Sequence, residues 1–175
     1  MSTTTQITIA AVQVVLAATF VLIPYVGARH GAAAQRAAEK NVTHQGFPAG
    51  LLAQHGINFG ATRTSVVLAL TIALCFAALG ALTLTAPDLA RPLTWIAQPI
   101  MLVLGLVIMP GEVFTTRYVE AAFRKSADPA THDLNVAAFV TAARKTYPTW
   151  FPTVVVTRFA TATAGSILAL VLLML

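Results

Sequence analysis

The sequence predicts an all-α integral membrane protein, a bundle of four transmembrane helices with short amphipathic helices in two long cytoplasmic loops. Three observations lead to this prediction. The chain has 175 residues, of which 57% are hydrophobic and only 10% are charged, whereas soluble domains have about 25% charged residues. Four apolar runs are long enough to cross a hydrocarbon core, which takes about 20 helical residues. Most of the basic residues fall in the two long loops between these runs.

The four apolar runs are each expected to form one helix. They cover residues 7–28, 64–86, 93–114 and 153–175. A helix is expected because a single segment in lipid must satisfy its own backbone hydrogen bonds. Pro87 and Pro92 mark a tight turn between the second and third spans, because proline stops one helix and is tolerated at the start of the next. We therefore interpret residues 1–175 as a single transmembrane domain.

The distribution of charge predicts the orientation of the spans. Loops 29–63 and 115–152 hold most of the lysine and arginine, and cytoplasmic loops of membrane proteins carry such an excess. We therefore expect both loops in the cytoplasm, both termini outside, and the protein in the inner (plasma) membrane. The net charge of +5 has the same explanation. No aromatic-basic motif of a nucleic-acid module accompanies it, so nucleic acid is not an expected partner.

Small residues at four-residue spacing predict where the spans pack. Membrane helices gain most from close van der Waals approach at small residues. The second span offers Ala69, Ala73, Ala77 and Ala81, and the fourth offers the pairs Ala160 with Ala164, Thr161 with Gly165, and Ala162 with Ser166. Packing within the bundle is the first interpretation of these faces. A seam between two copies of the chain is the alternative.

The long loops are expected to contain helices of their own. In the second loop, Thr131 or Asp133 is a candidate N-cap and Pro148 a stop signal. The apolar residues between them share one helical face: Val136, Phe139, Val140, Ala143 and Tyr147. A helix on the cytoplasmic membrane surface fits this pattern, and docking on a partner protein is the alternative. In the first loop, we expect the first span to continue for about three turns, and "AGLLA" (49–53) to dip into the membrane interface.

One carboxylate lies at the inner end of the third span. Glu112 follows Pro110 and Gly111, and this pair should loosen the helix because proline removes a backbone hydrogen bond and glycine weakens the turn. Arg158 lies at a similar depth on the antiparallel fourth span. An ion pair between the two, fixing the third span against the fourth, is the first interpretation, because charged groups within membranes are usually paired.

The same region is the candidate binding site. Arg63, at the start of the second span, is the next expected partner of Glu112, and His55 lies shortly before it. With Arg158 they would form a net positive cluster with donors for an anionic head group, a carboxylate or a quinone oxygen. Phospholipid bound between basic residues is a known pattern on the cytoplasmic side. Bound phospholipid or quinone is thus the candidate ligand, with no resident cofactor predicted and the catalytic residues, if any, unknown.

Histidine and cysteine do not indicate a metal or haem site. The histidines all lie in the loops: His30, His44, His55 and His132. Haem in a bundle needs imidazoles that project from helices into the core, and the spacing of these residues matches no metal-binding motif. Cys75 is the single cysteine and lies within an apolar run, so we expect it to be a small buried hydrophobic residue.

These observations favour a non-enzymatic accessory or structural subunit of an inner-membrane complex. It would contact other membrane subunits, or a second copy, through its alanine faces and loop helices. The alternative is a small enzyme or carrier that binds a lipid-like or quinone-like amphiphile at the cytoplasmic leaflet. A channel is a weaker option, because the first two spans contain no charged residue. A transporter would need matched breaks in two halves, and only the third span, with Pro99 and Pro110, is expected to be interrupted.

Overall fold

The computed structural model describes residues 2–48, 50–124, 131 and 133–175, so Lys125 and His132 lie outside the described residues. Four helical segments are long and apolar enough to cross a membrane. They are α1 (Thr3–His44), α3 (Arg63–Thr85), α4 (Pro87–Val107) with α5 (Pro110–Val113), and α8 (Phe151–Ala160) with η2 (Thr161–Gly165) and α9 (Ser166–Met174). Shorter helices lie between them: α2 (Leu51–Gln54), α6 (Thr115–Arg124) and α7 (Val136–Arg144). The helical fold class with four candidate spans is therefore confirmed.

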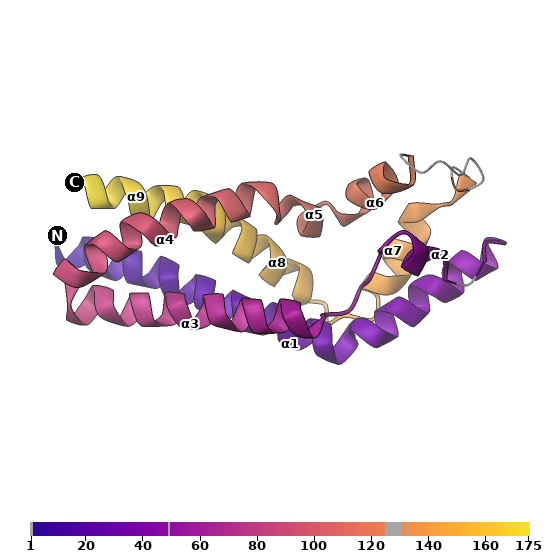
Figure 1. Cartoon of the computed structure of the whole chain (residues 1–175), viewed down its shortest axis with the longest axis horizontal. Coiled ribbons are helices and arrows are strands. Elements are labelled where there is room, and N and C mark those ends of the chain that lie inside the picture. Colours follow the sequence, from indigo (N-terminus) through magenta and orange to yellow (C-terminus); the bar gives the residue numbers. More distant parts are fainter. Residues whose placement is uncertain (1, 49, 125–130, 132) are drawn as a thin grey trace.

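The molecule has two regions that lie end to end (Figure 1). The first part of α1 packs with α3, α4, α8 and α9 in the bundle, and both termini lie at its far end. The rest of α1, from about residue 30, packs with α2, α6 and α7 in a second region, which we call the head. Both long loops contribute residues to the head core. The prediction that these loops lie at the same end of the bundle is confirmed.

The head has an apolar core of its own. Phe139 of α7 is completely buried in it, and its ring makes edge contacts with the rings of Phe59 and Phe123, at centroid distances of 6.4 and 6.3 Å. Leu51 and Leu52 of α2 are buried in the same core. Leu51 and Leu52 therefore face the head core.

The predicted helix of the second loop is α7, and its apolar face is buried within the chain. This face packs in the head core, largely against α1, so it is not free to lie on lipid or on a partner protein. The N-cap is Asn135, whose side-chain oxygen accepts a hydrogen bond from the Ala138 backbone N–H at 3.0 Å. The candidates Thr131 and Asp133 were wrong, because Leu134 first turns into the core and asparagine caps equally well.

Helix α1 continues into the head for longer than the sequence predicted. It ends at His44, more than four turns beyond residue 28. The chain then returns across α1 at a close approach between two glycines. A Cβ atom added to Gly31 would lie 2.4 Å from the Cα atom of Gly60, so only a residue without a side chain fits there. This crossing holds the returning segment against α1 at the junction of the two regions.

Buried polar side chains link the helices of the bundle. Gln13 of α1 donates from Nε2 to the Thr94 hydroxyl of α4 at 3.1 Å and accepts from the Thr83 hydroxyl of α3 at 2.9 Å. Gln98 of α4 accepts from the Ser166 hydroxyl of α9 at 2.8 Å. All five side chains are buried. Hydrogen bonds of this kind hold membrane helices together, because lipid tails offer polar groups no alternative partner.

Of the small-residue pairs of the fourth span, Ala162 with Ser166 packs within the bundle as predicted, whereas Ala160 and Ala164 are exposed. Ala162 and Ser166 are both buried, and Ala162 faces Gly105 of α4. A Cβ atom added to Gly105 would lie 3.2 Å from the Ala162 Cβ atom. The two helices therefore approach closely at this point.

The alanine ladder of the second span does not form one continuous contact. Ala73 is buried, but Ala77 and Ala81 are exposed. The reason is geometric, because a strict four-residue spacing turns about 40° per step around a helix with 3.6 residues per turn. Cys75 is also exposed, which corrects the expectation that it is buried, since an apolar run in a span has an outward side as well as a core side.

Candidate functional site

Glu112 lies on a separate turn of helix between the third span and the head. Helix α4 ends at Val107, and α5 forms one short turn that begins at Pro110. Phe114 then leaves the helical conformation, with φ −103° and ψ 38°, before α6 begins. Because proline has no N–H to continue the helix, the predicted break falls at Pro110, whereas α4 continues through Pro99.

The carboxylate of Glu112 forms an ion pair with Arg158 of α8, through Oε2 and Nη2. The predicted contact between the third and fourth spans is therefore confirmed. The two side chains differ strongly in exposure, since Arg158 is 6% exposed and Glu112 is 45% exposed. The guanidinium carbon of Arg158 also lies 5.1 Å from the centroid of the Phe20 ring of α1, a cation–π geometry.

The guanidinium of Arg158 has hydrogen-bonding capacity that the described residues do not use. Its Nε and Nη2 atoms are buried and make no hydrogen bond within the described part of the chain, although Nη2 is ion-paired with Glu112. A guanidinium carries five N–H donors in a fixed planar fork, and a buried donor without a partner is unfavourable. Nε therefore has neither a hydrogen bond nor an ionic partner among the described residues.

The fourth span is irregular directly after Arg158. Residues 161–165 form a π-helical turn, η2. The Thr161 hydroxyl donates to the Thr157 carbonyl at 2.8 Å, and the Thr163 hydroxyl donates to the Phe159 carbonyl at 2.7 Å. Side-chain bonds of this type satisfy backbone groups where a membrane helix departs from regular geometry.

The expectation that only the third span is interrupted was therefore wrong. The break in the fourth span lacks the proline signal of the third. Its available signal was the cluster of threonines at 157, 161 and 163, which can bond to their own helix. Turns of this kind are frequent at functional sites, and this one packs against α4 at Gly105.

The other two predicted site residues lie elsewhere. Arg63 begins α3 and is exposed, and it forms no ion pair with a residue of the described chain. His55 lies in the head, with Nδ1 3.0 Å from the Leu51 carbonyl and its ring centroid 4.7 Å from that of Phe123. Of the four predicted residues, the structure brings together Glu112 and Arg158.

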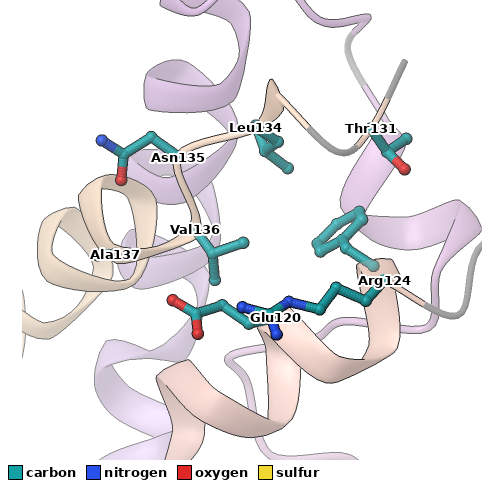
Figure 2. Close-up of a pocket in the computed structure, with 8 residues that line it drawn as sticks. Glu120, Arg124, Thr131, Leu134, Asn135, Val136 and Ala137 are labelled. Atoms are coloured by element: carbon teal, nitrogen blue, oxygen red, sulfur yellow. The ribbon is translucent and has the colours of Figure 1, made fainter. Parts of the chain in front are cut away.

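A hollow of about 440 Å³ lies in the head, between α6 and the start of α7. Figure 2 shows Glu120 and Arg124 on the α6 side of this hollow and Asn135 on the opposite side. Phe123, Leu134 and Val136 supply apolar lining. The two charges have opposite sign, so the hollow has no net preference for an anion or a cation.

An apolar groove runs along the outside of the bundle between α1 and α3. Its lining is entirely apolar: Val14, Ala17, Ala18 and Val21 from α1, and Leu70, Ala73, Leu74 and Ala77 from α3. No group of three or more histidine, cysteine, aspartate or glutamate side chains within the described residues could hold a metal ion.

Comparison with known proteins does not identify the chain. No known protein family, no curated protein and no solved structure matches it. What the molecule does must therefore be argued from the chemistry of its own side chains, and Arg158 is the group with the clearest unmet requirement.

Proposed function

We propose that this chain crosses a membrane four times and binds the anionic group of a lipid-like amphiphile at Arg158, with the head on the cytoplasmic side. The observation that carries the proposal is the guanidinium of Arg158, which is 6% exposed, has one carboxylate partner, and has a buried Nε without a hydrogen bond within the described residues. A charged group in such a place requires anionic or hydrogen-bonding partners.

The position of Arg158 supports a ligand that enters from the membrane. It is the eighth residue of α8, about 10 Å along the helix at 1.5 Å per residue. Helix α8 begins at the end of the bundle that faces the head (Figure 1). Lipid head groups bind basic residues at this level of membrane proteins. The planar fork of arginine suits the paired oxygens of a phosphate or carboxylate. A quinone oxygen, which accepts at a single atom, would use the fork less fully.

Lipid retention tests this proposal. The full chain is purified in mild detergent, exchanged into nanodiscs that contain phosphatidylglycerol and phosphatidylcholine, and its bound lipid is measured by native mass spectrometry. We expect selective retention of phosphatidylglycerol, because phosphatidylcholine carries the same phosphate but neutralises it with a choline cation that would lie close to the arginine. Arg158→Gln should lose this selectivity about tenfold, because hydrogen bonds to charged groups contribute about 1.5–3 kcal/mol each. Arg63→Gln is the matched control, since it removes an exposed arginine and should change little. Equal retention of both lipids by the unaltered protein would contradict the proposal.

A role as an accessory or structural subunit of a membrane complex is the second candidate. The groove between α1 and α3 favours it, because its small apolar residues would let another transmembrane helix approach closely. Ala77→Phe should fill this groove without disturbing the bundle core, since Ala77 is exposed. Loss of a co-purified partner or of a dimer in this variant would support the role. A lone monomer, both for the unaltered chain and for the variant, would contradict it.

A further inference from the structure

We infer that Glu112 occupies the place of the ligand at Arg158, and that a phosphate-bearing group displaces it when it binds. This inference rests on the proposed function, and it adds which side chain competes with the ligand and which part of the fold moves. It follows from three features of the ion pair: the unequal exposure of its members, the short turn that carries Glu112, and the geometry of the guanidinium.

The unequal exposure means that the two partners need each other to different degrees. Arg158 is 6% exposed and Glu112 is 45% exposed. A carboxylate that is already half in solvent regains its hydration easily when it leaves an ion pair. A buried guanidinium without an anion is strongly unfavourable. A new anion at Arg158 would therefore replace the ion pair that Arg158 loses. Glu112 would be hydrated in exchange, so its loss of the ion pair costs little.

The local fold allows Glu112 to leave without unfolding a long helix. Glu112 lies on the four-residue turn α5, which is separated from α4 by the break at Ile108–Met109 and from α6 by Phe114. The backbone bonds of this turn are local: the Glu112 N–H donates to the Met109 carbonyl at 3.0 Å, and the Phe114 N–H donates to the Pro110 carbonyl at 2.8 Å. Rotation of the turn therefore breaks no backbone hydrogen bond to another long helix, and it changes mainly the packing of α5 against α8.

Arg158, in contrast, is held in place. It lies on α8, which packs against α1, and its guanidinium rests on the Phe20 ring. When the ion pair opens, the carboxylate moves and the guanidinium stays. The binding surface for the incoming group is thus already formed by the bundle.

The guanidinium geometry favours a group with two oxygens over the single contact of Glu112. Nε and Nη2 lie on one edge of the guanidinium plane. Glu112 forms its ion pair at Nη2, and neither Nε nor Nη2 makes a hydrogen bond within the described residues. A phosphate with two free oxygens can accept from both atoms in a bidentate arrangement, which is the strongest form of arginine recognition. Phospholipids and soluble phosphates share this chemistry.

The test compares the lipid affinity of Glu112→Gln with that of the unaltered chain. Nanodiscs with increasing phosphatidylglycerol in phosphatidylcholine are titrated, and bound lipid is measured by native mass spectrometry. We expect Glu112→Gln to bind phosphatidylglycerol roughly two- to fivefold more tightly, because it removes a partly exposed competing ion pair. Glu120→Gln, a carboxylate on the neighbouring helix α6, is the matched control and should bind as the unaltered chain does. Thermal unfolding of each variant checks that it is folded.

Hydrogen exchange gives a second measurement that does not depend on affinity. Amide exchange in residues 111–114 should become faster in the unaltered chain when phosphatidylglycerol binds, because the turn is released. Titration with inorganic phosphate in detergent separates the two sources of the ligand. Faster exchange with inorganic phosphate alone would assign the site to a soluble anion, and faster exchange with phosphatidylglycerol alone would assign it to a lipid; either result supports displacement.

The outcomes separate this inference from the proposed function. If the unaltered chain binds phosphatidylglycerol selectively but Glu112→Gln binds it equally or more weakly, Glu112 positions Arg158 and does not compete with the ligand, so the inference is overturned while the proposed function stands. If neither the unaltered chain nor Glu112→Gln prefers phosphatidylglycerol, the proposed function fails.

Discussion

The head and the bundle bury different kinds of side chain. The head core consists of large apolar residues, such as Phe139 and Leu52, brought together from four helices. The bundle core includes glutamine, threonine and serine, whereas its outer surface is covered by large apolar residues such as Leu74, which is 72% exposed. The head core is of the kind that the hydrophobic effect produces in water. The polar core and apolar surface of the bundle are the pattern expected of helices that pack in lipid, and four of its helical segments are long and apolar enough to cross a membrane. Arg158 lies where these two regions meet.

The largest effect is expected from a cavity in the head. Phe139→Ala removes a completely buried ring and should destabilise the head by about 3–5 kcal/mol. Thermal unfolding in detergent and limited proteolysis of the head measure this loss. Leu74→Ala on the outside of the bundle is the control and should change stability by less than about 0.5 kcal/mol. Equal losses in the two variants would show that the two regions do not differ in this way.

A smaller effect is expected in the bundle, where Thr83→Val removes the hydrogen bond to Gln13 with little change of shape. The expected cost is about 1 kcal/mol, because hydrogen bonds between membrane helices contribute about 0.6–2 kcal/mol. Thr71→Val is the matched control, since the Thr71 hydroxyl donates to the Val67 carbonyl of its own helix. Unfolding in a denaturing detergent gives the comparison. A Thr83→Val variant as stable as Thr71→Val would mean that the polar link does not stabilise the bundle.

An effect of similar size at neutral pH is expected at the base of the head. The Tyr147 hydroxyl donates to the Phe59 carbonyl, and its ring stacks on Phe151 at a centroid distance of 4.8 Å. Tyr147→Phe should cost about 1 kcal/mol at neutral pH, the usual net contribution of one hydrogen bond. Thermal unfolding measures this cost, and Tyr118→Phe, at an exposed tyrosine, serves as the control.

Tyr147 also predicts how the stability of the head depends on pH. Burial raises the pKa of Tyr147 above its ordinary value of 10.0. Because the pKa is higher in the folded state than in the unfolded state, the stabilisation is complete below pH 10 and is lost as the pH rises through the raised pKa. Unfolding measured across this range should show a steeper fall for the unaltered chain than for Tyr147→Phe. Parallel curves would contradict this assignment.

The sequence predicted properties that depend on distance along the chain. The length of a span follows from the length of an apolar run. The ion pair between Glu112 and Arg158 follows from their similar depth in two antiparallel helices. The sequence did not predict which way a side chain points around its helix, or which element covers a given helix face. Arg63 has a suitable depth, but its side chain is exposed. The apolar face of α7 was recognised, but an amphipathic pattern does not say what covers it, and α1 does so. The membrane itself, the orientation and the ligand remain proposals.

Helix α1 connects the hydrogen bonds of the bundle to the direction in which the head faces. It is a single helix of 42 residues, about 63 Å long at 1.5 Å per residue. Gln13 sets the rotation of this helix in the bundle, and Val42 presents its side chain to the head core about 40 Å further along. A slip of one residue at Gln13 would turn the far end by about 100°. The direction in which the head faces is thus set by the hydrogen bonds of Gln13 within the bundle.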